Sequence, residues 1–169
     1  MGLPHKLKNM NLFIDGGSWL GIVTEVTPPK MARKMEGYRA GGMDAEVDID
    51  MGGEKMEGEF TFGGLTTDII STFGAAVHDA AQFRFAGAYV SDDDGSTVPV
   101  EIVMRGRIAE FDEGSAKVGD DTEHKYKMSV SYYKRIENGR VIIEKDDPNF
   151  IFKVKGADRL AAQRAAIGL

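Results

Sequence analysis

The sequence contains no cysteine. A disulfide framework and a thiolate metal site are therefore both excluded, and folding in a reducing compartment is permitted. Proline is also scarce, with five residues among 169, whereas glycine is frequent, with 21 residues. Most of the glycines stand at the ends of apparent strands, which is typical of an all-β chain with many turns.

Positive charge is in deficit as well. The 27 acidic residues outnumber the 21 lysines and arginines, which gives a formal net charge of −6. A general nucleic-acid binder has to neutralise many phosphates, so this balance disfavours that class of protein.

Long apolar runs are missing from the start of the chain. The first candidate, residues 10–14, is interrupted by Asn11 and followed directly by Asp15. A membrane span needs about 20 predominantly apolar residues, and the apolar region of a signal peptide needs about 7–15. We therefore expect a chain that is made in the cytosol without membrane anchoring.

Motifs for catalysis and cofactor binding are missing too. The sequence has no G-x-S-x-G elbow and no phosphate-binding G-x-x-x-x-G-K-[ST] loop, and its three histidines lack a second ligand type at a metal spacing. Residues 48–59 match four positions of a helix-loop-helix calcium loop, but both flanks alternate like strands. We therefore expect no enzyme activity, no metal and no other cofactor.

Alternation of apolar and polar residues is the dominant pattern that is present. Its longest example, residues 98–136, predicts a long β-hairpin with a polar loop at 112–121. An arm of about 14 residues spans roughly 46 Å at ~3.3 Å per residue, whereas a compact chain of this length is about 40 Å across. Part of the hairpin should therefore protrude, and its edges need cover from the protein or from a neighbouring subunit.

One face of each arm of this hairpin is predicted to be buried. The predicted buried residues are Val98, Val100, Ile102, Met104, Gly106 and Ile108 in the first arm, and His124, Tyr126, Met128, Val130 and Tyr132 in the second. The pair Asn138-Gly139 is typical of a two-residue hairpin turn and predicts two further strands, 141–144 and 150–154.

The remaining pattern predicts a mainly β chain with one internal helix and a short C-terminal helix, folded as a single domain over residues 1–169. The internal helix, 65–74, is expected to be capped by Thr66, and the C-terminal helix, 158–167, by Asp158. The further predicted strands are 19–27, 83–90 and a hairpin formed by 44–51 and 55–62.

Several runs together resemble a known family. They are KNMNLF at 8–13, YRAGGMD at 38–44, RFAG at 84–87, MRGR at 104–107, SYYK at 131–134 and the ending 158–169. They occur in the right order over nearly the whole chain, and they are similar to the major tail tube protein of contractile-tailed bacteriophages and R-type pyocins.

This resemblance implies a β-sandwich or barrel-like fold and a structural role. Subunits of the family form hexameric rings whose sheets join into one inner barrel, and the rings stack into a tube inside a sheath. The implied partners are other copies, the tail sheath protein, and the baseplate and tail terminator proteins. The implied location is the virion tail or a pyocin-like particle, assembled in the bacterial cytoplasm, and in a phage DNA passes the lumen without specific binding. The alternative from another class is a soluble β-barrel that binds a small ligand.

Two segments are candidates for contacts between neighbouring subunits or between rings. Residues 1–14 look like an extended arm or a short strand. Residues 30–42 look like a long basic loop, with or without one short strand, for which a solvated surface is the alternative. Both carry apolar residues that a lone subunit would leave exposed. The candidate contact residues are Leu7, Met10, Phe13, Lys30, Arg33, Lys34, Met35, Tyr38 and Arg39.

An acidic stripe is the last candidate site. In residues 44–51, the alternation places Asp44, Glu46, Asp48 and Asp50 on one face and apolar residues on the other. The stripe could be a solvated outer face. It could instead line the bore of a tube, where carboxylates would repel the phosphates of passing DNA. A third interpretation pairs it with basic residues of segment 30–42 in a neighbouring subunit.

Overall fold

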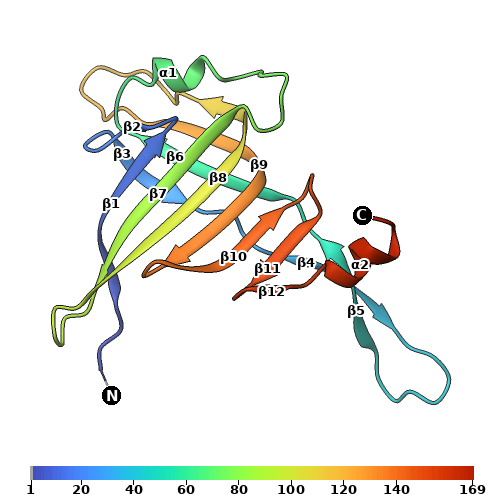
Figure 1. The fold of residues 1–169 in the computed structure, drawn as a ribbon. Coiled ribbons are helices and arrows are strands. Elements are labelled where there is room, and N and C mark those ends of the chain that lie inside the picture. The colour runs from blue at the N-terminus through green and yellow to red at the C-terminus, as the bar shows by residue number, and fades with distance from the viewer. Residues whose placement is uncertain (1) are drawn as a thin grey trace.

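The computed structural model describes residues 2–169, which are mostly β-structure with two short helices (Figure 1). The strands are β1 (Lys6–Ile14), β2 (Gly17–Ser18), β3 (Val23–Thr27), β4 (Arg33–Tyr38), β5 (Val47–Gly53), β6 (Met56–Phe62), β7 (Ala81–Val90), β8 (Thr97–Asp112), β9 (His124–Glu137), β10 (Arg140–Asp146), β11 (Ile151–Val154) and β12 (Ala157–Asp158). The helices are α1 (Thr67–Ile70) and α2 (Ala161–Ala166). Within residues 2–169, neither helix is long and apolar enough to cross a membrane.

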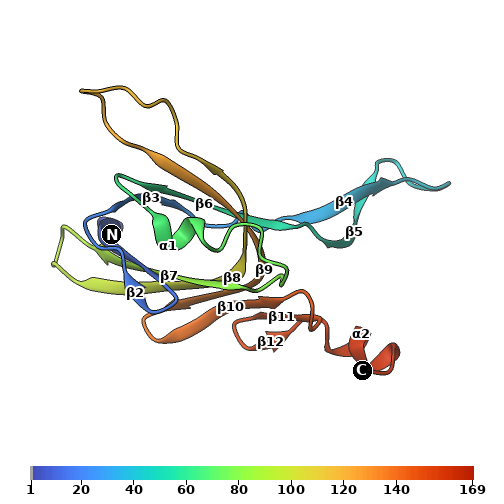
Figure 2. The same ribbon diagram turned by 90° about the horizontal axis from the view of Figure 1, so that it is seen from above.

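Ten strands form one antiparallel sheet, which branches at β9. The main path runs in the order β12-β11-β10-β9-β8-β7-β1-β2, while β6 pairs with the first half of β9 and β3 pairs with β6. Figure 2 shows the result as two facing layers, with β3 and β6 in one and β7 and β8 in the other. The predicted mainly β fold of sandwich or barrel type, with two short helices, is confirmed.

The core fills the space between the two layers. The alternate residues of β8 from Val100 to Ile108 face it, as the sequence predicts. Phe60 on β6 and Phe83 on β7 meet across the layers with ring centroids 4.6 Å apart. Such close aromatic packing leaves the interior occupied by the protein's own side chains.

The predicted buried face of β9 is correct only as far as Val130. Beyond this residue Tyr133 is buried and Tyr132 is only partly buried, which reverses the prediction. The register gives the reason, because Gly106 pairs with Val130 whereas Arg105 pairs with Tyr132. The extra residue on β9 is a β-bulge, and it moves the following side chains to the opposite face.

Two strand predictions were wrong about partners or continuity. Residues 44–51 and 55–62 do not form a hairpin, because β5 pairs with β4 in a separate two-stranded sheet and β6 pairs with β3 and β9. The predicted strand 19–27 is interrupted: β2 ends at Ser18, and a turn containing Gly21, with φ of +85°, precedes β3.

Both helices are shorter than predicted and neither uses the predicted cap. Thr66 makes no capping hydrogen bond, and its buried hydroxyl instead contacts the Tyr126 hydroxyl and lies 3.3 Å from Nδ1 of His124. Asp158 lies in β12, where its carboxylate binds Arg164 of α2. These side chains form tertiary contacts in place of the local caps.

The predicted arm at the start of the chain is a strand from Lys6 onward. β1 pairs with β7 along the main sheet, and Leu12 and Ile14 are part of the core. Only residues 2–5 of the described chain precede this strand. They lie against the loop between β7 and β8, where Ser96 Oγ is 2.9 Å from Nε2 of His5.

Two hairpins extend beyond the two-layered body. The loop that joins β8 and β9 projects on one side, in line with the length of these strands, and the β4–β5 hairpin projects on another (Figure 2). We call β4 and β5 together the ribbon.

Candidate assembly surface

The ribbon is a sheet of two strands, and within residues 2–169 no further strand pairs with it. Its register pairs Tyr38 with Val47 and Glu36 with Ile49. Its base lies beside the β10–β11 end and α2, and the rest of the ribbon projects away from the body (Figures 1 and 2). An isolated two-stranded hairpin is at best marginally stable in water. The ribbon therefore has the properties of an element that is completed by another molecule.

One face of the ribbon is mostly apolar. Directly paired residues of antiparallel strands share a face, so Tyr38, Val47 and Ile49 lie together, with Met51 two residues further along β5. Glu36, the partner of Ile49, is the charged residue on this face. Tyr38, Val47, Ile49 and Met51 are between 44% and 56% exposed. A contiguous exposed cluster of this kind marks a site of protein interaction. We call it the apolar face of the ribbon.

The opposite face carries the acidic residues of β5. Asp48 and Asp50 point away from the apolar face, as the alternation predicts, and Met35 shares their face through its pairing with Asp50. Asp44 and Glu46 lie in the connection before β5 and not in the strand. The predicted four-residue stripe is therefore regular only at its two β5 positions.

Asp50 has a partner in its own chain. Arg33 Nε donates a hydrogen bond of 2.8 Å to its Oδ2. This bond, followed by one from the Gly52 amide, holds the pKa of Asp50 below its usual range. Among the described residues, the ion pairs do not include the other basic candidates, Lys30, Lys34 and Arg39. The third interpretation of the stripe included Arg33 among four possible basic partners, but placed the pair between subunits.

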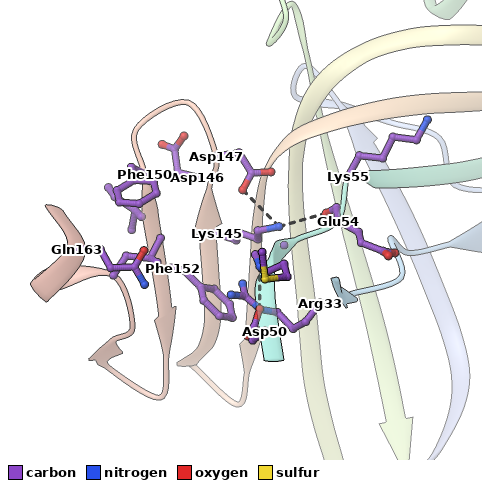
Figure 3. A pocket seen from close by; sticks show the side chains of 15 residues that line it. Arg33, Asp50, Glu54, Lys55, Lys145, Asp146, Asp147, Phe150, Phe152 and Gln163 are labelled. Atoms are coloured by element: carbon purple, nitrogen blue, oxygen red, sulfur yellow. Dashed lines mark hydrogen bonds and ion pairs between the residues drawn. The ribbon is translucent and has the colours of Figure 1, made fainter. Parts of the chain in front are cut away.

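The base of the ribbon is fastened to the body by a buried lysine (Figure 3). Lys145 on β10 places Nζ 3.4 Å from the Glu54 carbonyl oxygen and 3.3 Å from the Asp147 carboxylate. The Arg33 guanidinium lies over the Phe152 ring, 5.4 Å from its centroid. These contacts fix the direction in which the ribbon leaves the body.

Beside these contacts is a hollow of about 720 Å³ between the ribbon base, the β10–β11 end and α2 (Figure 3). Its wall includes the Arg33–Asp50 and Lys145–Asp147 pairs. The same hollow is also lined by apolar side chains such as Phe150 and Phe152, so charged pairs and apolar groups are mixed in it.

The candidate contact residues of β1 differ in how far their own chain covers them. Leu7 is exposed, Met10 packs against the core, and the ring of Phe13 is covered by Arg84, whose guanidinium carbon is 4.1 Å from the ring centroid. Sequence reasoning did not identify Val47, Ile49 and Met51 as contact residues. The sequence signal for these residues was their period-two pattern, which does not tell a core face from a contact face.

Comparison with known proteins identifies the family. Residues 4–168 match the model of the family described as "Phage tail tube protein FII". The chain is 42% identical over 172 residues to the tail tube protein of Escherichia phage P2, with 100% of both chains covered. It is 39% identical over 158 residues to the major tail tube protein of Serratia phage KSP20, covering 92% of this chain and 91% of the relative.

Solved structures agree on the fold. A chain from the cryo-EM structure of the PVC sheath/tube terminator, part of an extracellular contractile injection system, has a TM-score of 0.59 at 9% identity, covering 76% of this chain and 93% of that one. A chain from the PVC sheath-tube complex has a TM-score of 0.58 at 8% identity, with 76% and 88% covered. The resemblance stated from the sequence is thus confirmed by family match and relatives. The chain belongs to the phage tail tube protein FII family, as a structural, non-enzymatic tail tube protein.

Proposed function

We propose that this tail tube subunit forms hexameric rings that stack into a tube inside a contractile sheath. The observation that carries the proposal is the apolar face of the ribbon, which the subunit's own body leaves uncovered. Fully burying one large apolar side chain contributes about 1.5–3 kcal/mol. Covering the exposed half of four such side chains would therefore stabilise each contact by roughly 3–6 kcal/mol before association costs.

Free sheet edges support the joining of neighbouring sheets into one inner barrel. At one end of the main sheet, β2 pairs only with Phe13 and Ile14, so the outer edge of β1 from Lys6 to Met10 has no strand partner within residues 2–169. Edges of this kind are completed by strands of another chain. In a ring, every β1 edge would meet the sheet of the next copy.

The candidate contact residues of β1 and segment 30–42 fit the same assembly. Leu7 lies on the free edge of β1, and Met35 and Tyr38 are exposed on the ribbon. The residues we assign to contacts between subunits or rings are Leu7, Met10, Phe13, Lys30, Arg33, Lys34, Met35, Tyr38 and Arg39.

We also propose partners other than the chain itself, by analogy with the structural neighbours. These neighbours come from a sheath-tube complex, a sheath/tube terminator and the baseplate of the anti-feeding prophage. We assign a sheath protein, a terminator and a baseplate protein to this chain as partners, with assembly in the bacterial cytoplasm. In a phage the lumen would conduct DNA. A small-ligand barrel is not supported, because the interior is filled by side chains such as Phe60, Phe62 and Tyr126.

The test is whether assembly depends on the apolar face. We expect sedimentation and negative-stain imaging to show rings or tubes of the unsubstituted chain, alone or in the complete particle. Ile49→Asp should stay folded by circular dichroism but should not assemble, because a carboxylate would then be buried in the contact. Val118→Asp, at a fully exposed position of the β8–β9 loop, is the control and should assemble normally. Tubes of normal yield from Ile49→Asp would refute the role of the ribbon.

A further inference from the structure

A groove runs over the outer side of the main sheet, on the face away from the core. It has a volume of about 640 Å³ and lies across β1, β7, β8 and the β9–β10 turn. Outward-facing Ala86, Ala88, Pro99 and Ile136 form part of its lining, and Leu20, which is 70% exposed, stands at its rim. We call this hollow the outer groove.

The chemistry of the outer groove selects an apolar occupant. Glu101 is its single ionisable lining residue, and its carboxylate is bound by the guanidinium of Arg84. Asn9 and Asn11 supply polar groups at the β1 side. The groove therefore offers no unpaired charge to a phosphate or a carboxylate, and an apolar segment is the kind of partner that would displace its water favourably.

The ribbon carries an apolar segment of fitting size. Val47, Ile49 and Met51 project from one face of β5 at a repeat of about 6.6 Å, so the row is roughly 13 Å long. Three adjacent strands spaced about 4.8 Å apart are roughly 10 Å wide between their outer axes. The row of side chains is thus comparable with the width of the β1–β7–β8 surface.

The ribbon cannot reach the groove of its own chain. In both views the ribbon projects from one side of the body, whereas the β7–β8 turn beside the groove lies on the opposite side (Figures 1 and 2). A contact between two different surfaces of identical chains is heterologous, and it repeats from copy to copy until a ring closes or a filament grows. This is the type of contact that a ring or tube requires.

We infer that the apolar face of the ribbon of one copy occupies the outer groove of the next copy. The inference rests on the proposed assembly and adds the surface that receives the ribbon. Its partner is a second copy of this chain, and its contact residues are Tyr38, Val47, Ile49 and Met51 on one side and Leu20, Ala86, Ala88, Pro99 and Ile136 on the other.

The lack of cysteine in this chain allows a direct test by disulfide formation. A variant with Ile49→Cys and Ala88→Cys should, after assembly and oxidation, give a ladder of covalent oligomers on a non-reducing gel, because a disulfide forms only when the two Cα atoms approach within about 7 Å. The matched control combines Ile49→Cys with Val77→Cys, an exposed apolar position beyond α1. The control pair and each single variant should give no ladder.

Imaging of the same samples separates the two proposals. Two results would overturn the groove as the receiving surface while leaving tube assembly intact. One is tubes of the Ile49→Cys/Ala88→Cys variant that give no ladder. The other is tubes in which only the control variant gives a ladder. Failure of the unsubstituted chain to form rings or tubes, alone or in the particle, would overturn both. If Ala88→Cys impairs folding, Ala86→Cys probes the same groove with the same expected ladder.

Discussion

At the scale of single residues, the joint between β8 and β9 depends on Gly106. A Cβ atom built on this glycine would lie 1.9 Å from the backbone carbonyl oxygen of Ser129. The close approach occurs at the bulge where β9 changes its buried face. A backbone atom cannot yield as the end of a flexible side chain can, so a side chain here would force the two longest strands apart.

We therefore predict that Gly106→Ala lowers the free energy of unfolding by about 3 kcal/mol or more. Thermal or denaturant unfolding followed by circular dichroism measures this change. The control is Gly41→Ala in the ribbon connection, where a Cβ would meet nothing within 4 Å, and which should be close to neutral. Equal stability of Gly106→Ala and the unsubstituted chain would show that the strands separate at little cost.

At the scale of elements, α2 is held in place mainly by one ion pair, and packing contributes less. None of its residues is buried, and Arg164 binds the Asp158 carboxylate and donates a hydrogen bond of 2.8 Å to the carbonyl oxygen of Phe150. A helix of this length is not stable alone. Its position therefore depends on Arg164, which sequence reasoning did not single out because a lone arginine has no pattern.

The pH dependence of α2 follows from the same pair. The hydrogen bond from Arg164 lowers the pKa of Asp158, with the Leu160 amide as a smaller cause in the same direction. Because the folded-state pKa is depressed, the stabilisation is present above the unfolded pKa of about 3.9 and is lost as pH falls through the folded value.

We predict that amide hydrogen exchange of α2 accelerates below about pH 4, relative to the intrinsic rate at each pH, while the core strands keep their protection. Asp158→Asn should accelerate exchange in α2 at neutral pH and remove this acid-dependent step. An α2 that is equally protected at pH 7 and pH 3 would contradict the anchoring role of the pair.

The strands also show which features could be predicted from the sequence and which could not. Period-two alternation correctly gave the two faces of β5 and the buried face of β8, because side-chain direction depends only on local backbone geometry. It paired β5 with β6 wrongly, since nothing local distinguishes a neighbour in the sequence from a distant strand. The switch of the buried side chains of β9 from one face to the other could not be predicted from the sequence either, because a bulge depends on the register with β8.

At the scale of the whole molecule, only part of the candidate assembly surface had a signal in the sequence. The sequence marked Met35 and Tyr38 as contact candidates, but the apolar face formed by Val47, Ile49 and Met51 emerged only when the structure showed that no core lies against it. The outer groove is lined by residues of four strands, β1, β7, β8 and β9, and of two turns. Such a surface has no sequence signal, because its members share only their position in the folded sheet.

The acidic face of the ribbon has a role that depends on the assembled particle. If the apolar face packs on a neighbour, the opposite face with Asp48 points away from that contact and is available to line the bore. Asp50 is already paired with Arg33, so Asp48 is the carboxylate of β5 to test. Asp48→Lys changes the charge by two units per subunit, and the change repeats around every ring.

We predict that Asp48→Lys leaves tubes intact but slows DNA release from particles that carry it, because lysines along the bore attract phosphates at many subunits at once. Added salt should restore the rate, since the screening length falls from about 10 Å at 0.1 M to about 3 Å at 1 M. The control is Asp79→Lys, which makes the same charge change at an exposed position in the loop after α1. Release measured by a DNA-binding dye after triggered ejection would distinguish the two variants. An equal delay in both, or a delay that salt does not relieve, would place the acidic face outside the bore.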